Sequence, residues 1–173
     1  FAELAEKADG KVWSARLLAR KPAAAAAGPL AIERAGAADA PAIARLIEEA
    51  GLPASNIDAA NVSFVAARDG ARLAGCGGVE LYGDTALLRS LAVCPEYRAQ
   101  GLGRRLGAAM LDEARRAGAR QAVILTHNLQ QAATALGFVA VARETLPEAL
   151  RRSWELTADC CGTAICMALE LRT

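Results

Sequence analysis

The chain of 173 residues has no long apolar run, little net charge and no cysteine pattern typical of disulfides. Charged residues interrupt every apolar stretch before it reaches the roughly 20 residues that a membrane-spanning helix needs, so we expect no membrane partner. The formal net charge is +1 and the arginines form no stripe, which argues against binding nucleic acid. Five cysteines, an odd number, favour a reducing compartment, and we expect a cytoplasmic protein.

The first 28 residues differ in character from the rest. The chain starts at Phe1 rather than at methionine, so we expect a fragment, a processed product or a domain cut from a longer polypeptide. The run of alanines that ends at Gly28-Pro29 is typical of a linker, although alanine runs also form helices. We therefore expect residues 1–28 to be an N-terminal segment and linker, and residues 29–173 to form one folded domain.

From residue 30 onward, strand-like and helix-like patterns alternate. The pattern is that of an α/β (α+β) domain with a mixed central β-sheet flanked by helices. Turn signals such as Asp69-Gly70 and Gly83-Asp84 separate the strands of a meander. The expected strands are 30–34, 61–67, 72–82, 85–93, 121–126, 138–142 and 164–171. The expected helices are 39–51, 102–117, 129–136 and 147–159.

The most informative stretch is the glycine-bearing turn between the expected strand 85–93 and the expected helix 102–117. The first turn of a helix presents backbone N–H groups without intrahelical partners and the positive end of the helix dipole, so it attracts anions. Gly101 and Gly103 leave room for a close approach, and Arg98 and Arg104 add positive charge. The turn is therefore predicted to hold a pyrophosphate.

The spacing Arg98-x-x-Gly101-x-Gly103, followed later by Leu136-Gly137-Phe138, resembles the acyl-CoA signature of the GNAT acetyltransferases. The alternative is a glycine pair that merely closes a strand-to-helix turn. The resemblance implies the GNAT fold and acetyl-CoA as cosubstrate. It also implies that strand backbone holds the pantetheine arm, although these strand side chains can simply be core. The implied cofactor-binding residues are Leu91, Ala92, Val93, Arg98, Ala99, Gln100, Gly101, Leu102, Gly103 and Arg104.

The resemblance is incomplete at the position of the family's general acid. Many members carry a tyrosine where this chain has Ala133, and its absence puts the usual protonation of the departing thiolate in doubt. His127, the single histidine, follows the expected strand 121–126, and histidine exchanges protons near neutral pH. Glu80 and Tyr82 are the other catalytic candidates. Alternatively, His127 is a solvated loop residue, and Glu80 and Tyr82 are outward-facing strand residues.

Two further resemblances concern the ends of the chain. Residues 1–22 weakly resemble the end of a class I methyltransferase domain, so 1–28 could include the remnant of a preceding, fused domain. The C-terminal part resembles the GNAT branch associated with arsenic resistance, on Arg143, Leu146-Pro147-Glu148-Ala149, Ser153, Cys160 and Ala164-Ile165-Cys166-Met167.

The cysteines of this part permit two interpretations. Cys160, Cys161 and Cys166 could hold a trivalent arsenical, since thiolates suit soft ions. Alternatively they pack as small hydrophobes, and the spacing lacks the CxxC pairs of a zinc site, so we expect no metal.

Together these features predict an acetyl-CoA-dependent N-acetyltransferase acting on a small-molecule amine, with a possible link to arsenic resistance. The competing hypothesis is a non-catalytic GNAT module that binds CoA or a trivalent metalloid and acts as a sensor or fused partner. A homodimer is compatible with either. The sequence does not identify the acceptor; by resemblance, an arsenic-related small molecule or a free amino acid is expected.

Overall fold

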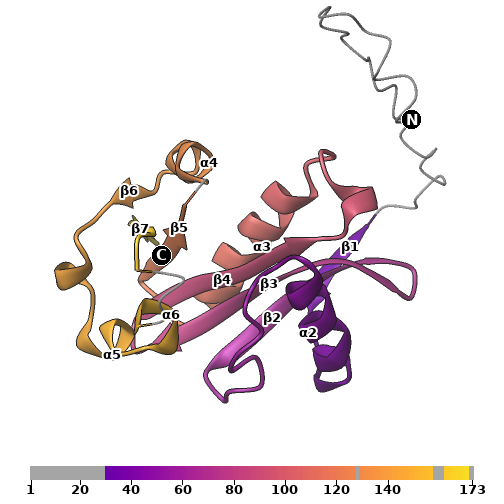
Figure 1. The fold of residues 1–173 in the computed structure, drawn as a ribbon, viewed down its shortest axis with the longest axis horizontal. Coiled ribbons are helices and arrows are strands. Elements are labelled where there is room, and N and C mark those ends of the chain that lie inside the picture. Colours follow the sequence, from indigo (N-terminus) through magenta and orange to yellow (C-terminus); the bar gives the residue numbers. More distant parts are fainter. Residues whose placement is uncertain (1–29, 128, 158–161, 172–173) are drawn as a thin grey trace, which may run out of the picture.

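The computed structural model describes residues 30–127, 129–157 and 162–171. The expected linker, the methyltransferase-like segment, Cys160 and Cys161 lie outside these ranges. In the described residues, seven strands form one mixed sheet in the order β1-β2-β3-β4-β5-β7-β6 (Figure 1). Strands β4 and β5 are parallel and all other neighbours are antiparallel, which confirms the expected fold class. No described helix is both long and apolar enough to cross a bilayer.

The helices and strands follow the sequence patterns closely over most of the described chain. The strands are β1 (Ala31–Arg34), β2 (Val62–Asp69), β3 (Arg72–Tyr82), β4 (Thr85–Val93), β5 (Gln121–Thr126), β6 (Val139–Ala140) and β7 (Ile165–Glu170). The α-helices are α2 (Ala40–Glu49), α3 (Leu102–Arg116), α4 (Gln130–Ala135), α5 (Glu148–Arg151) and α6 (Trp154–Thr157). Short 3-10 turns occur at Ala37–Asp39, Pro95–Tyr97 and Arg143–Thr145.

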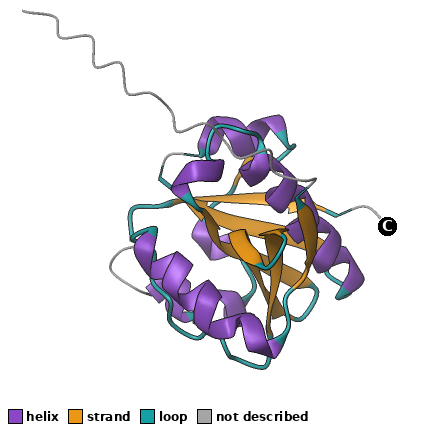
Figure 2. Cartoon of the chain, turned by 90° about the vertical axis from the view of Figure 1, so that its right-hand side faces the viewer, coloured by secondary structure: helices purple, strands orange, loops and turns teal. Residues whose placement is uncertain are grey.

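Helices flank the sheet (Figure 2). Helices α2 and α3 pack on it through separate apolar clusters. Ile43, Leu46 and Ile47 recur at helical spacing on α2 and pack with Phe64 and Cys76. Helix α3 buries a stripe of its own against β2, β3 and β4, formed by Leu102, Leu106, Met110 and Leu111.

Helix α3 approaches strand β3 very closely. An added Cβ at Gly77 would lie 2.4 Å from Met110 Sδ, and one at Gly75 would lie 2.8 Å from Leu106 Cδ1. The glycines therefore let α3 lie directly on the sheet, which sets the place of the turn that precedes the helix.

The C-terminal part differs from two sequence expectations. The single helix predicted over 147–159 is two short helices, α5 and α6, which are separated at Ser153. Leu150 and Leu156 are both buried, so the chain turns between them to place both against the sheet. The strand predicted over 138–142 is only Val139–Ala140, because β7 is its one neighbour in the described sheet and the chain enters a 3-10 turn at Arg143.

A β-bulge in strand β4 opens the sheet. Cys76 pairs with Ala92 and Gly78 with Arg89, so two residues of β4 face the single residue Gly77 between those pairs. Ser90, at the bulge, has a φ of +53°. The parallel pairing of β4 with β5 ends at Leu88, opposite Ile124. Beyond that point the two strands are not paired, and the sheet splits between them.

Candidate active site

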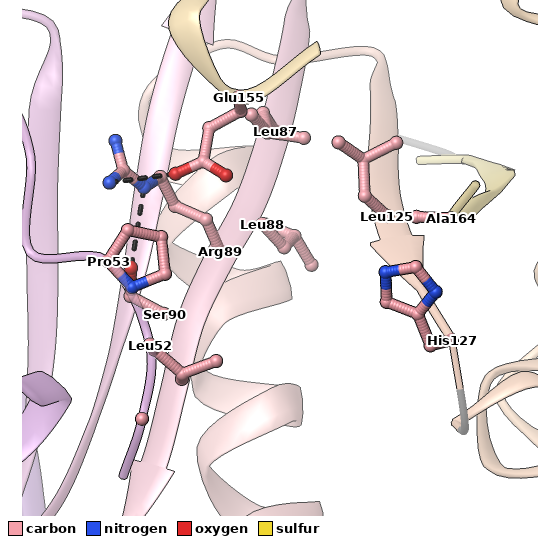
Figure 3. Close-up of a pocket in the computed structure, with 11 residues that line it drawn as sticks. Leu52, Pro53, Leu87, Leu88, Arg89, Ser90, Leu125, His127, Glu155 and Ala164 are labelled. Atoms are coloured by element: carbon pink, nitrogen blue, oxygen red, sulfur yellow. Dashed lines mark hydrogen bonds and ion pairs between the residues drawn. The ribbon is translucent and has the colours of Figure 1, made fainter. Parts of the chain in front are cut away.

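The split between β4 and β5 contains a pocket of about 280 Å³ (Figure 3). Its walls come from the loop after α2, the bulged part of β4, the end of β5, helix α6 and the start of β7. The lining residues are Gly51, Leu52, Pro53, Leu87, Leu88, Arg89, Ser90, Leu125, His127, Glu155 and Ala164. Chain segments that are distant in sequence thus meet at one mostly apolar cavity.

A buried ion cluster forms one wall of this pocket. Arg89 Nη1 lies 2.9 Å from Glu80 Oε2, and Arg89 Nη2 lies 2.8 Å from Glu155 Oε1. The side chains of Arg89, Glu80 and Glu155 are only 4%, 8% and 11% exposed. Arg89 Nη2 also donates to the carbonyl oxygen of Ser55 at 2.7 Å, which attaches the α2–β2 loop to the cluster. Buried charges persist when they are paired and hydrogen-bonded, as these are.

Tyr82 extends the cluster but does not line the pocket. Its hydroxyl donates a hydrogen bond of 2.5 Å to Glu80 Oε1, so both oxygens of Glu80 have partners. Burial, and then the bond to Glu80, raise the pKa of Tyr82 well above its ordinary value. Tyr82 is therefore a neutral hydrogen-bond donor that fixes Glu80.

The structure separates the three catalytic residues predicted from the sequence. His127 lines the pocket and is exposed at the end of β5. Glu80 and Tyr82 do not line it; Glu80 is paired with Arg89, and Tyr82 is hydrogen-bonded to Glu80. Glu80 is 6% exposed, so the alternative of an outward-facing strand residue is wrong for Glu80.

Sequence reasoning missed Arg89 and Glu155, although one signal was available. An arginine within the apolar stretch of β4 needs a buried acidic partner, which pointed to a charged cluster. Nothing local identified Glu155 as the partner, because that pairing depends on the turn between α5 and α6.

The predicted pyrophosphate turn follows strand β4 directly. Gly101 is the N-cap residue of α3 and has a φ of +77°, a conformation that side chains with a Cβ rarely adopt. The amides of the first helical turn, Leu102 to Arg104, have no intrahelical acceptors. Arg98 Nε donates to the carbonyl oxygen of Val93 at 2.9 Å, which ties the turn to the end of β4. The turn thus combines free amides, the helix dipole and arginines, as an anion site requires.

The other predicted cofactor residues lie on strand β4 before the turn or in the turn itself. Leu91 and Val93 are partly buried against the α3 cluster, and Ala92 is buried against α2. Gln100 Nε2 donates to the carbonyl oxygen of Glu96 at 2.7 Å, and Ala99 and Arg104 are exposed. Because β4 has no strand partner beyond Leu88 on its β5 side within the described sheet, its backbone there is available to a ligand.

The described cysteines are buried or partly buried free thiols. Burial raises the pKa of Cys166 and of Cys94, and raises that of Cys76 to about 12. Thiols in such surroundings remain protonated at neutral pH. Among the described residues there is no group of three or more His, Cys, Asp or Glu side chains that could hold a metal ion.

Comparison with known proteins identifies the family. A model of the acetyltransferase (GNAT) family matches residues 34–138, more than half of the chain. The chain belongs to the GNAT family. Comparison with curated proteins finds no match to this GNAT protein.

Solved structures with the same fold include enzymes of known activity. N-acetylglutamate synthase from Neisseria gonorrhoeae, complexed with coenzyme A and N-acetyl-glutamate, matches 84% of this GNAT chain at 27% identity with a TM-score of 0.69. The chain spans only about a third of that protein's length, 36%. The ribosomal-protein-S18-alanine N-acetyltransferase from Escherichia coli matches 84% of this chain and 96% of its own, at 22% identity and a TM-score of 0.62.

A third structure was determined with a cofactor. It is a putative acetyltransferase from Salmonella typhimurium with acetyl-CoA, which matches 84% of this chain and 96% of its own at 18% identity and a TM-score of 0.59. At such identities the likeness concerns the fold.

Proposed function

We propose that this GNAT protein transfers the acetyl group of acetyl-CoA to the amino group of a small molecule. The observation that carries the proposal is the place of the pocket: it opens at the bulge of β4, and the same strand leads into the glycine turn that precedes α3. A cofactor bound along β4 would therefore have its phosphates at the turn and its thioester beside the pocket.

The cofactor would be held mainly by backbone groups. The amides at Gly101 to Arg104 would take the pyrophosphate, with Arg98 and Arg104 as counter-charges. The unpaired edge of β4 from Leu91 to Val93 would bond the pantetheine arm as an added strand does. Similar structures with CoA or acetyl-CoA support this assignment.

The reaction would proceed by direct attack. The acceptor amine, once it has lost a proton, attacks the thioester carbonyl carbon; the C–N bond forms and the C–S bond breaks. His127, which lines the pocket, would take the proton from the amine, and the CoA thiolate is protonated as it leaves, so that the products are the amide and CoA. The alanine at position 133 has no ionisable group, so this position supplies no acid and the thiolate would be protonated from solvent.

The proposal is tested by release of free thiol from acetyl-CoA in the presence of a panel of small amines, with the acetylated product identified by mass spectrometry. The resemblance to the arsenic-resistance branch places an arsenic-bearing amine in the panel. Amine-dependent thiol release with a matching acetyl amide supports the proposal. Binding of acetyl-CoA without turnover of any amine would overturn it.

That second outcome is the one expected of a non-catalytic module that binds CoA. The alanine at position 133 favours this alternative, because helix α4 has no ionisable side chain within Gln130–Ala135 to protonate a thiolate.

A further inference from the structure

Resting on the proposed function, we propose that the side-chain hydroxyl of Ser90 donates a hydrogen bond to the carbonyl oxygen of the thioester and stabilises the negative charge that develops there during acetyl transfer. Ser90 lines the pocket and lies in the bulge of β4, and it was not among the catalytic residues predicted from the sequence. In Figure 3 it lies beside Arg89, and a dashed line joins the two side chains.

The bulge turns the side chain of Ser90 toward the pocket. In a regular strand, residues three positions apart lie on opposite faces of the sheet. Leu88 and Leu91 are three positions apart, yet both pack in the apolar cluster around α3. The extra residue of the bulge accounts for this, because it shifts the alternation by one. Ser90 therefore lines the pocket together with its neighbour Arg89.

The backbone at Ser90 has a conformation that favours glycine. Its φ of +53° lies in the left-handed region, where a Cβ is poorly tolerated. The side chain is only partly buried, so packing offers little in return. Residues held in such conformations are frequent at active sites, where the surrounding structure keeps a side chain in one place. The conformation therefore points to a role for the hydroxyl itself.

The hydroxyl of Ser90 has a proton available to a ligand. Its Oγ accepts a hydrogen bond from Arg89 Nε at 3.4 Å. A serine hydroxyl can accept and donate at the same time, and within the described part of the chain its proton has no acceptor. The positive charge of the guanidinium polarises the hydroxyl, which makes it a stronger donor.

Ser90 lies where the thioester would come to rest. In the proposed complex, the pantetheine arm runs along the β4 edge from Val93 to Leu91, away from the glycine turn. It can go no further than Leu88, because β4 there pairs with Ile124 of β5. The thioester at the end of the arm is therefore confined to the short stretch between Leu91 and Leu88. Ser90 is the residue of that stretch whose side-chain donor has no acceptor within the described residues.

The proposed hydrogen bond would act on the charge that forms during the reaction. As the amine nitrogen bonds to the carbonyl carbon, the carbonyl oxygen becomes an oxyanion. It then reforms the double bond, and the C–S bond breaks. Ser90 keeps its proton throughout. A donor fixed in advance stabilises the oxyanion more than the neutral carbonyl, so its removal should lower kcat and leave the affinity for acetyl-CoA almost unchanged.

The first test needs no acceptor amine. Infrared spectroscopy of the protein with acetyl-CoA that carries an isotope label at the thioester carbonyl carbon measures the stretching frequency of that bond. We expect the frequency to fall on binding to the wild type, and at least half of this shift to be lost in Ser90→Gly, where glycine adopts the positive φ without strain. Ser63→Ala is the control, at a partly exposed strand serine outside this pocket, and should show the wild-type shift.

The second test measures turnover with an amine that supports thiol release. Ser90→Gly and Ser90→Ala both lack the hydroxyl, and only the alanine keeps a Cβ at the positive φ. Both should lower kcat about a hundredfold. Calorimetry should find the Kd for acetyl-CoA within twofold of wild type. A loss of kcat in Ser90→Ala alone would assign the effect to the backbone and overturn the role of the hydroxyl.

The outcomes distinguish this inference from the proposed function. No frequency shift in the wild type, the full shift in folded Ser90→Gly, or a kcat of Ser90→Gly close to that of the wild type would overturn the role of Ser90 even if the protein acetylates amines. Conversely, a shift that depends on Ser90, without thiol release with any amine, would overturn the proposed transfer reaction and keep Ser90 as the residue that contacts the thioester carbonyl.

Discussion

Nη2 of Arg89 lies 2.8 Å from Oε1 of Glu155, and this ion pair joins the centre of the sheet to a short C-terminal helix. Arg89 immediately precedes the bulge of β4, where β4 and β5 separate. The same guanidinium also donates a hydrogen bond to the carbonyl oxygen of Ser55 in the loop after α2. One buried side chain thus holds together three of the walls of the pocket.

Replacing Arg89 by methionine should destabilise the fold. It leaves the buried carboxylates of Glu80 and Glu155 without their cation, a loss of about 3–5 kcal/mol in the free energy of unfolding. Urea denaturation at pH 7 measures this loss in the free energy of unfolding. Arg152→Met removes an exposed pair with Glu148 and should change stability by no more than about 0.5 kcal/mol.

Replacing Gly101 by valine should weaken acetyl-CoA binding more than tenfold. An added Cβ would meet no atom within 4 Å, so the change acts through the backbone, because a β-branched residue resists a φ of +77°. The loss of two charge-assisted hydrogen bonds of ~1.5–3 kcal/mol each would lower the affinity for acetyl-CoA by more than tenfold. Calorimetric titration with acetyl-CoA measures this affinity. An unchanged affinity in a folded variant would exclude this turn as the phosphate site.

The matched control on the same helix is Gly107→Ala. A Cβ at Gly107 also meets nothing within 4 Å, and its backbone is helical. This variant should retain its affinity for acetyl-CoA and gain about 0.5–1 kcal/mol of stability, because alanine loses less conformational entropy in a helix.

If the protein acetylates amines, His127→Gln should lower kcat tenfold to a hundredfold, because the residue takes the acceptor proton. Cys94→Ser should keep turnover within a few-fold, since burial raises the pKa of the Cys94 thiol and makes it a poor nucleophile. Mass spectrometry after incubation with acetyl-CoA should find no acyl adduct on Cys94. An adduct that passes into product would replace direct attack by a covalent route, and full activity of His127→Gln would remove His127 from the mechanism.

Cys76 should make stability fall at alkaline pH. Burial raises its pKa from 9.0 to about 12, so the thiol ionises in the unfolded chain before it does in the folded protein. The contribution of the buried Cys76 thiol to the free energy of unfolding is complete below pH 9. It is lost as the pH rises toward 12, by at most about 1.4 kcal/mol per pH unit. The difference in unfolding free energy between wild type and Cys76→Ala should decrease over this range. A difference independent of pH would contradict the buried-thiol explanation.

The domain boundary proposed from the sequence leads to a truncation test. A chain that begins at Pro29 keeps every element of the described sheet, so its Tm should stay close to that of the full chain. A fall of many degrees would show that residues 1–28 pack on the domain.

The sequence predicted the fold well where a pattern is local. Ile43, Leu46 and Ile47 recur at helical spacing, and the strands of the meander end at glycine turns, so α2 and β2 to β4 were expected almost at their observed limits. The glycine turn before α3 was likewise visible, because Gly101 marks a backbone conformation that other residues avoid.

The acceptor side of the site could not be predicted in the same way. Glu80 and Tyr82 were expected at the reaction centre. Their spacing on β3 does not predict that Arg89 pairs with Glu80, nor that Arg89 lines the pocket while Glu80 and Tyr82 do not. Glu155 was expected inside one continuous helix, and only packing of Leu150 and Leu156 on the sheet breaks that helix at Ser153.

The sequence by itself therefore determined the order of the elements and the glycine turn before α3, because turn glycines and apolar periodicity act on neighbouring residues. Tertiary structure alone decided that Arg89 meets Glu155, and that His127 and Glu155 line one pocket. The physical reason is that a buried charge requires a partner but does not specify which one. The partner is chosen by the bulge of β4 and by the packing that turns α6 over the sheet.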